Sequence, residues 1–187
     1  MQSSTKYDRL PPDLLRKLVD YDMVTGLFTW RHRPTARPEW NTRYAGTAIC
    51  CPAKSGYLML GFSADGVKAN YLLHRAAFAY VTGEWPTLYV DHINGIRTDN
   101  RWDNLRQVNC RENHMNVHKI KSPCRFKGVW QHPDTGRFRA TIRFHGKNYY
   151  LGYHADAETA ARAYDDAAQE MFGAFARTNA SMGLLDA

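Results

Sequence analysis

The sequence lacks long hydrophobic runs and contains few cysteines. None of its 187 residues lies in a stretch approaching the ~20 uninterrupted apolar residues that a bilayer crossing needs, and residues 1–22 carry charges of both signs. The four cysteines include an adjacent pair, and none has the C-x2-C spacing of a zinc knuckle. These absences argue against a membrane span and a zinc or disulfide scaffold, so we expect a soluble, cytoplasmic protein with reduced thiols.

Aromatic and apolar residues, in contrast, are plentiful. The chain is 44% hydrophobic and contains 5 Trp, 11 Tyr and 8 Phe. This composition is too apolar for a disordered chain, and we therefore expect packed cores. The length leaves room for one domain or for two or three small modules.

Positive charge is concentrated in one short part of the chain. The formal net charge of +7 divides into +4 for residues 1–118 (15 basic, 11 acidic), +7 for residues 119–154 (8 and 1) and −4 for residues 155–187 (2 and 6). So dense a basic segment is typical of a surface that binds a polyanion, most often nucleic acid. An ordinary solvated basic face is the alternative interpretation.

Hydrophobic spacing and turn residues predict an α+β protein. In the N-terminal part, the expected elements are a short helix after Pro11-Pro12, a strand at 27–30, a Pro- and Arg-rich loop from Arg31 to Arg43, a hairpin over 57–73 and a helix at 75–81 that ends at Gly83.

The middle of the chain combines a histidine with oxygen-bearing side chains. A strand-like run ends at Asp91-His92, residues 104–108 look like a returning strand, and a helix is expected from Cys110 to about Val117. Phosphodiester hydrolysis needs a base that works near neutral pH and a divalent cation, which histidine and a pair of oxygen ligands can supply. Each of these residues alone is more often structural, whereas the ordered set is specific.

This order resembles the HNH endonuclease family, particularly the HNH proteins of phages and mobile introns. The residues that carry the resemblance are Asp91-His92-Ile93-Asn94-Gly95, Asp99-Asn100-Arg101, Asn104-Leu105 and Glu112-Asn113. The resemblance implies a ββα-metal core over about residues 88–118, within a nuclease region that spans residues 1–118. It extends back through His74, for which a packed histidine is expected more than a phosphate contact.

The resemblance also implies a role for each motif residue. His92 is the general base, and Asn104 holds the loop around that base. Asp91 and Asn113 bind one divalent metal ion, either Mg²⁺ or Mn²⁺. His114 stands next to Asn113 and is the alternative ligand, although the spacing from Asp91 and the Glu-Asn pair favour Asn113.

The C-terminal part predicts a three-stranded antiparallel sheet packed on one helix. Over residues 138–144, apolar side chains alternate with polar or basic ones, which is the period of a strand with one apolar and one cationic face. Further strands are expected at 126–130 and 148–151. A helix should run from Ala157 to Phe172 with Asp156 as its N-cap.

This part resembles the Apetala-two (ethylene-response factor) DNA-binding domain, through motifs such as Gly136-Arg137-Phe138 and Tyr150-Leu151-Gly152. The resemblance implies a domain over residues 126–180, after a basic linker at 119–125 and before a tail at 181–187. It also implies that the outer face of the sheet lies in the DNA major groove. Carried over by position, the DNA-binding residues are Lys127, Trp130, Arg137, Arg139, Thr141, Arg143, Asn148 and Tyr150.

Together, these features predict a metal-dependent endonuclease of phage-encoded or homing type that acts on double-stranded DNA. We expect it to work in the cytoplasm, that of the host cell if a phage encodes it, without a membrane or a small-molecule substrate. One alternative is a nuclease of defence or DNA packaging with loose specificity. Another is a DNA-binding regulator with an inactive nuclease fold, against which the intact set of Asp91, His92 and Asn113 argues.

Overall fold

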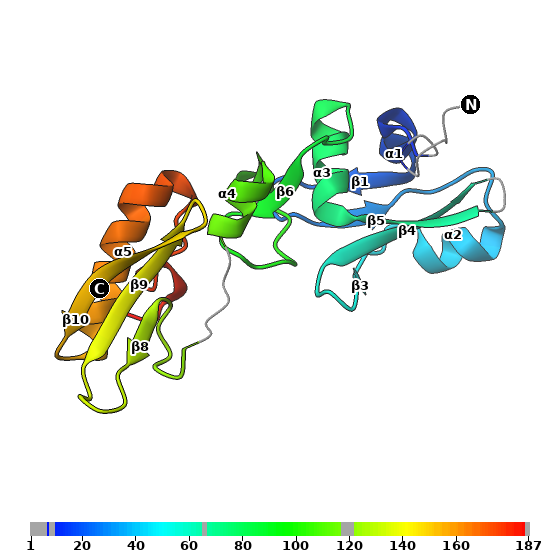
Figure 1. The fold of residues 1–187 in the computed structure, drawn as a ribbon. Helices are drawn as coiled ribbons and strands as arrows, with labels where there is room; N and C mark the ends of the chain where they lie inside the picture. The colour runs from blue at the N-terminus through cyan, green and yellow to red at the C-terminus, as the bar shows by residue number, and fades with distance from the viewer. Residues whose placement is uncertain (1–6, 8–9, 65–66, 117–121, 186–187) are drawn as a thin grey trace. The chain divides into compact units, whose positions relative to one another are not determined.

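The structure, a computed structural model, describes residues 7, 10–64, 67–116 and 122–185 (Figure 1). The chain forms two compact units, Met1–Asn109 and Cys110–Ala187. All strand pairs are antiparallel, which confirms the α+β class. No helix in the described ranges has the length and apolar character needed to cross a membrane.

The first unit contains three small sheets, β1-β2, β3-β4-β5 and β6-β7. Its elements are α1 (Pro12–Leu18), β1 (Val19–Tyr21), β2 (Phe28–Trp30), α2 (Pro38–Tyr44), β3 (Cys51–Pro52), β4 (Leu58–Ala64), β5 (Val67–Leu72), α3 (Leu73–Thr82), β6 (Tyr89–His92), the 3-10 turn η1 (Trp102–Asn104) and β7 (Leu105–Val108).

Helix α3 is at the centre of the first unit's core and packs against α1, β4 and β5. Its buried Ala76, Ala77 and Ala79 have small side chains, which let these elements approach closely. Val90 of β6 and Leu105 of β7 belong to the same core. The strands on either side of the candidate catalytic loop are therefore anchored in the packed interior.

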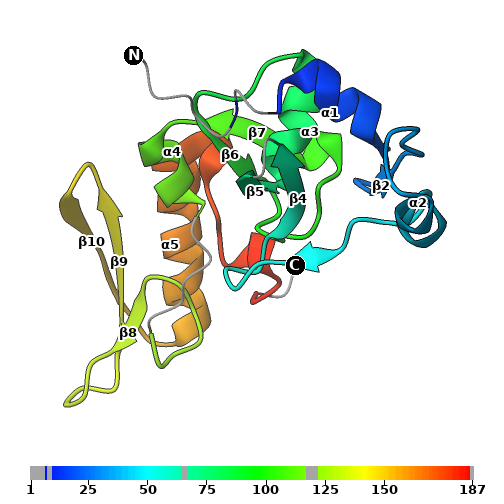
Figure 2. The ribbon, with the colours of Figure 1, turned by 90° about the vertical axis from the view of Figure 1, so that its right-hand side faces the viewer.

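The second unit confirms the expected sheet, in the order β10-β9-β8, with one helix along one face (Figure 2). Its elements are α4 (Cys110–Met115), β8 (Val129–Gln131), β9 (Phe138–Phe144), β10 (Lys147–His154), α5 (Ala157–Phe172) and the 3-10 turns η2 (Gly173–Phe175) and η3 (Ala180–Met182). The Asp156 carboxylate accepts a hydrogen bond from Thr159 N at 2.7 Å and so caps α5 as expected.

Helix α4, expected near the end of the nuclease region over residues 1–118, falls in the second compact unit, which begins at Cys110. The expected tail is part of the second core, because Leu185 is buried with Phe126 and Val129. The buried Asp165 carboxylate holds this segment by accepting hydrogen bonds from Asn179 N at 2.7 Å and from Ala180 N at 2.8 Å. Residues 119–121 of the expected linker lie outside the described residues.

Candidate functional site

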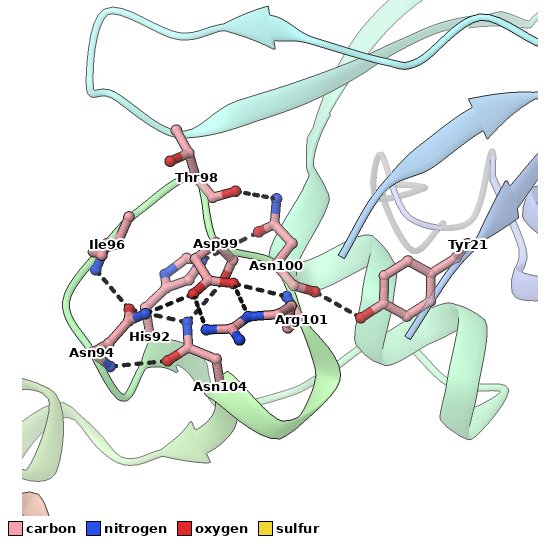
Figure 3. Close-up of polar contacts among 9 residues, drawn as sticks. All are labelled: Tyr21, His92, Asn94, Ile96, Thr98, Asp99, Asn100, Arg101 and Asn104. Atoms are coloured by element: carbon pink, nitrogen blue, oxygen red, sulfur yellow. Dashed lines mark hydrogen bonds and ion pairs between the residues drawn. The ribbon is translucent and has the colours of Figure 1, made fainter. Parts of the chain in front are cut away.

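The loop between β6 and β7 is closed by the side chain of Asn104 (Figure 3). Its Oδ1 accepts a hydrogen bond from Asn94 N at 2.9 Å, while its Nδ2 donates to Asp99 O at 2.8 Å and to Asn94 Oδ1 at 3.0 Å. Asn104 is buried, so these bonds are protected from water. One amide therefore fixes the loop at two separate points.

A second set of polar contacts holds the same loop through Asp99. Arg101 donates from Nε at 2.8 Å and from Nη2 at 2.7 Å to the two carboxylate oxygens, and Asn94 Nδ2 donates to Oδ2 at 2.6 Å. The Arg101 hydrogen bonds are the main reason why the pKa of Asp99 falls to about 2. Asp99 therefore remains a carboxylate at neutral pH and supports the loop as an anion.

His92 ends β6 and is almost completely buried, with 3% of its surface exposed. Its Nε2 lies 3.2 Å from Asn100 Oδ1, and the main-chain oxygen of Asn100 accepts a 2.7 Å hydrogen bond from the core residue Tyr21. The His92 ring packs edge-on against His74, with 5.0 Å between the ring centroids, and the Tyr57 ring lies 4.8 Å from His74. These contacts determine the position of the imidazole.

Burial also sets the protonation state of His92. Desolvation lowers its pKa below the ordinary value, and the smaller opposing effects come from the Asn100 hydrogen bond and from the carboxylates of Asp91 and Asp99. The imidazole is consequently neutral at neutral pH and can accept a proton.

Asp91 precedes His92 on β6 and pairs with Arg106 across the β6-β7 ladder. Arg106 donates from both Nε and Nη2 to Asp91 Oδ2, each at 3.0 Å. Both side chains are largely buried, so the guanidinium compensates a carboxylate that has little access to water. The site therefore combines a buried anion with a neutral base one residue away.

The structure brings Asp91, His92 and Asn104 together, whereas Asn113 lies on α4 in the second unit. The side chain of His114 lies outside the described part of the chain. Within the described ranges, no three His, Cys, Asp or Glu side chains gather closely enough to hold a metal. This finding is compatible with a donor pair made of one carboxylate and one amide oxygen, which suits Mg²⁺ or Mn²⁺ when water completes the coordination.

The sheet of the second unit has the two faces that its sequence pattern predicts. Ala140 and Ile142 of β9 are buried on the side of α5, while Arg139 and Arg143 are exposed on the other side. Residues paired across an antiparallel sheet share a face, and the partners of β9 complete the outer one. These pairs are Trp130 with Arg139, Tyr150 with Thr141, and Asn148 with Arg143.

The two remaining residues expected on this face lie outside the strands. Arg137 is exposed just before β9 and donates from Nη2 to Tyr153 O at 3.0 Å. Lys127 is partly buried in the turn before β8, where its Nζ donates to Arg177 O at 2.9 Å. Burial lowers the pKa of Lys127 to about 8. Its ammonium group is thus engaged with the C-terminal segment instead of joining the arginines of β9.

Comparison with known families matches both regions. Residues 71–115 match the family model of the HNH endonuclease, and residues 124–174 match that of the AP2 domain. The first match runs from the end of β5 to α4, and the second contains the whole sheet and α5. The chain carries an HNH endonuclease domain followed by an AP2 domain.

One similar solved structure is that of the HNH homing endonuclease I-HmuI, a protein that binds and cleaves DNA. The sequences are 23% identical, the alignment covers 52% of this chain and 50% of that chain, and the TM-score is 0.39. The match therefore spans about half the length of that protein. The assignment of the HNH and AP2 domains depends on the family matches.

Several residues that shape the HNH site were not expected from the sequence. Asn100 belongs to the Asp99-Asn100-Arg101 motif, but its contact with His92 depends on the fold of the loop. His74 is packed as expected, with 4% of its surface exposed, but its ring contacts with Tyr57 and His92 join segments far apart in the chain, and no local pattern indicates them. Arg106 could have been found, because pairing the two predicted strands as a hairpin places it opposite Asp91.

Tyr153 of the AP2 domain was also missed. Strict alternation from Asn148 and Tyr150 would turn residues 152 and 154 outward. Instead, the register shifts between Tyr150 and Tyr153, and Tyr153 pairs with Arg139. This irregularity adds a second tyrosine to the outer face, where Tyr150 and Tyr153 make an edge contact with 5.7 Å between ring centroids.

We expect buried His74 to make the stability of the chain depend on pH. Its Nδ1 is buried without a hydrogen-bond partner among the described residues, and burial lowers its pKa to about 3. The unfolded chain, with an ordinary histidine pKa near 6.5, therefore binds a proton that the folded state rejects. Stability should be greatest above about pH 6.5 and should fall on acidification by up to ~1.4 kcal/mol per pH unit.

Urea unfolding at pH 7 and pH 5 measures this effect. Between pH 7 and pH 5, the free energy of unfolding should decrease more in wild type than in His74→Leu. The exposed His145 provides a matched control, since His145→Leu should retain the wild-type pH dependence. Equal pH dependence in wild type and His74→Leu would contradict the assignment.

Proposed function

We propose that this chain is a metal-dependent endonuclease that hydrolyses phosphodiester bonds in double-stranded DNA. The observation that carries the proposal is the neutral, buried and oriented imidazole of His92 beside the carboxylate of Asp91, inside a region that matches the HNH endonuclease family. The AP2 domain, with its exposed arginines and aromatic residues, would hold the duplex. We further propose a homing-type or phage-encoded enzyme that acts in the cytoplasm.

His92 is the proposed general base. In the proposed tautomer, Nε2 of His92 donates to the amide oxygen of Asn100, and Nδ1 is the basic nitrogen. Nδ1 would take a proton from the water that attacks phosphorus. The imidazolium that forms is favoured by the carboxylates of Asp91 and Asp99, both of which raise the pKa of His92. Asn104 would position this base through the loop and would not itself transfer protons.

Asp91 and Asn113 are the proposed ligands of one divalent ion, Mg²⁺ or Mn²⁺. The Asp91 carboxylate supplies a hard oxygen donor next to His92, and the Asn113 amide supplies the second protein oxygen. Such an ion, when bound, neutralises charge on the scissile phosphate and the leaving oxygen. Arg106 would orient the Asp91 carboxylate through its two hydrogen bonds.

The outer face of the AP2 sheet is the proposed surface for DNA. Arg139 and Arg143 offer guanidinium groups for phosphates and base edges, and a sheet of this size fits the major groove. Trp130, Tyr150 and Tyr153 add exposed aromatic rings around them. We include Tyr153 in the DNA-binding set and leave out Lys127, because its ammonium group donates to Arg177 O.

Replacing His92 with Ala should abolish cleavage while DNA binding persists, because the base is lost and the AP2 sheet is unchanged. Supercoiled plasmid incubated with Mg²⁺ measures cleavage, and fluorescence anisotropy of a labelled duplex in EDTA measures binding. The exposed His145 serves as the control, so His145→Ala should cut at the wild-type rate. EDTA should stop plasmid cleavage by the wild-type chain.

Two results would count against this assignment. Cleavage by His92→Ala at the wild-type rate would exclude His92 as the general base. Parallel loss of cleavage and binding would show that His92 has a structural role. Binding without cleavage by the wild-type chain, with either metal, would favour a DNA-binding regulator with an inactive nuclease fold.

Replacing Arg139 and Arg143 together with Ala should weaken binding to duplex DNA and reduce its salt dependence. Each lost phosphate contact lowers the slope of log Kobs against log salt by about 0.9, so the double variant should lose up to about 2. The exposed Arg162 on α5 is the control, and Arg162→Ala should keep the wild-type slope. An unchanged slope in the double variant would remove this face from the interface.

A further inference from the structure

The first unit contains a second concentration of positive charge, in a segment that the proposed site does not use. Residues 31–43 contain four arginines and one glutamate, a net charge of +3, whereas residues 1–118 as a whole carry +4. The segment ends in α2, a helix without a single buried residue. Most of the net charge of this region therefore lies on a segment, residues 31–43, in which no residue is buried.

The segment is nevertheless held in a defined conformation. Trp40 of α2 packs edge-on against Trp30 of β2, with 5.5 Å between ring centroids, and the Arg33 guanidinium lies 4.6 Å from the centroid of the Trp40 ring. The Asn41 side chain accepts a hydrogen bond from Arg33 N at 2.9 Å and donates to Arg33 O at 2.8 Å. Because loop and helix are joined in these ways, a ligand would bind here at a small cost in ordering.

Two of the four arginines serve the structure itself. Arg31 donates from Nη1 to Arg16 O at 2.9 Å and lies 3.4 Å from the Asp20 carboxylate. Arg33 stacks on Trp40 as described. Arg31 thus holds the segment against α1 and β1, and Arg33 joins the loop to α2.

The other two, Arg37 and Arg43, are exposed at the beginning and the end of α2. Arg43 has its guanidinium 5.3 Å from the Tyr44 ring centroid. In the part of the chain that the structure describes, no acidic side chain forms an ion pair with Arg37 or Arg43. Two guanidinium groups on a fixed framework are thus available to an external anion.

A shallow groove with a partly polar lining runs between the loop and α2. Its lining includes His32, Asn41 and Thr42 together with three small apolar residues. The Asn41 amide and the Thr42 hydroxyl already serve the segment, since Thr42 Oγ1 donates to Pro38 O at 3.1 Å, so the arginines are the main groups for an anion. A guanidinium group binds phosphate oxygens through two parallel hydrogen bonds, which makes arginine well suited to a polyphosphate backbone.

We propose that this segment, residues 31–43, is an additional binding surface for the phosphate backbone of double-stranded DNA, with Arg37 and Arg43 as its contact residues. The proposal rests on the proposed function, because the HNH domain must hold the same duplex that it cuts. Contacts to phosphate position a duplex and carry little sequence information. The surface would therefore add affinity without changing sequence preference.

The test compares three double variants of the full chain. In Arg37→Ala/Arg43→Ala, the slope of log Kobs against log salt for a 40-bp duplex, measured by anisotropy in EDTA, should fall by about 2, and affinity at ~0.1 M salt should fall roughly tenfold. Arg37→Lys/Arg43→Lys keeps the charge and should restore most of the slope. Lys17→Ala/Lys68→Ala removes the same charge from exposed positions on α1 and β5 and should leave the slope unchanged.

The surface would be excluded by an unchanged slope in Arg37→Ala/Arg43→Ala, or by an equal fall in the Lys17→Ala/Lys68→Ala control. Thermal unfolding should be the same in all variants, since all four replaced side chains are exposed. Plasmid cleavage with Mg²⁺ separates this proposal from the nuclease assignment. If the salt slope of Arg37→Ala/Arg43→Ala is lower than that of wild type but wild type never cuts DNA, the nuclease assignment is wrong and the proposed binding surface stands. If wild type cuts DNA and the two slopes are equal, the nuclease assignment stands and the proposed binding surface is wrong.

Discussion

A buried imidazole at the end of β6 is the feature on which the rest of the site depends. His92 is neutral because it is desolvated, and it is oriented because Asn100, His74 and Tyr57 surround it. Asn100 is in turn tied to Tyr21 of the core. The packing of the first unit therefore controls both the position of the proposed base and its protonation state.

The loop that follows His92 shows how a short polar motif can replace regular structure. Asn94, Asp99 and Asn104 satisfy one another and the neighbouring backbone within about a dozen residues. These bonds explain why asparagine and aspartate recur at these positions, since each offers a short side chain that can bond to nearby backbone groups. The cross-strand pair of Asp91 and Arg106 compensates charge on the proposed ligand.

Sequence reasoning succeeded where structure depends on local patterns. The alternation in β9 and the cap at Asp156 predicted both elements to the residue, because a strand period and an N-cap involve only neighbouring residues. It could not supply contacts between distant segments, such as the hydrogen bond from Lys127 to a carbonyl fifty residues away. Nor could it find helix α2, which buries no side chain and so has no hydrophobic pattern, or the register shift that pairs Tyr153 with Arg139. The contacts of His92 with His74 and Tyr57 likewise required the fold.

The most direct test of this account is the state of the His92 ring in solution, measured by two-dimensional ¹H–¹⁵N NMR of the histidine side chains with His92→Asn to assign the signals. The account predicts that the neutral ring carries its hydrogen on Nε2 and that its pKa lies below the ordinary histidine value. A ring protonated on Nδ1 in its neutral form, or a pKa above the ordinary value, would contradict the proposed base.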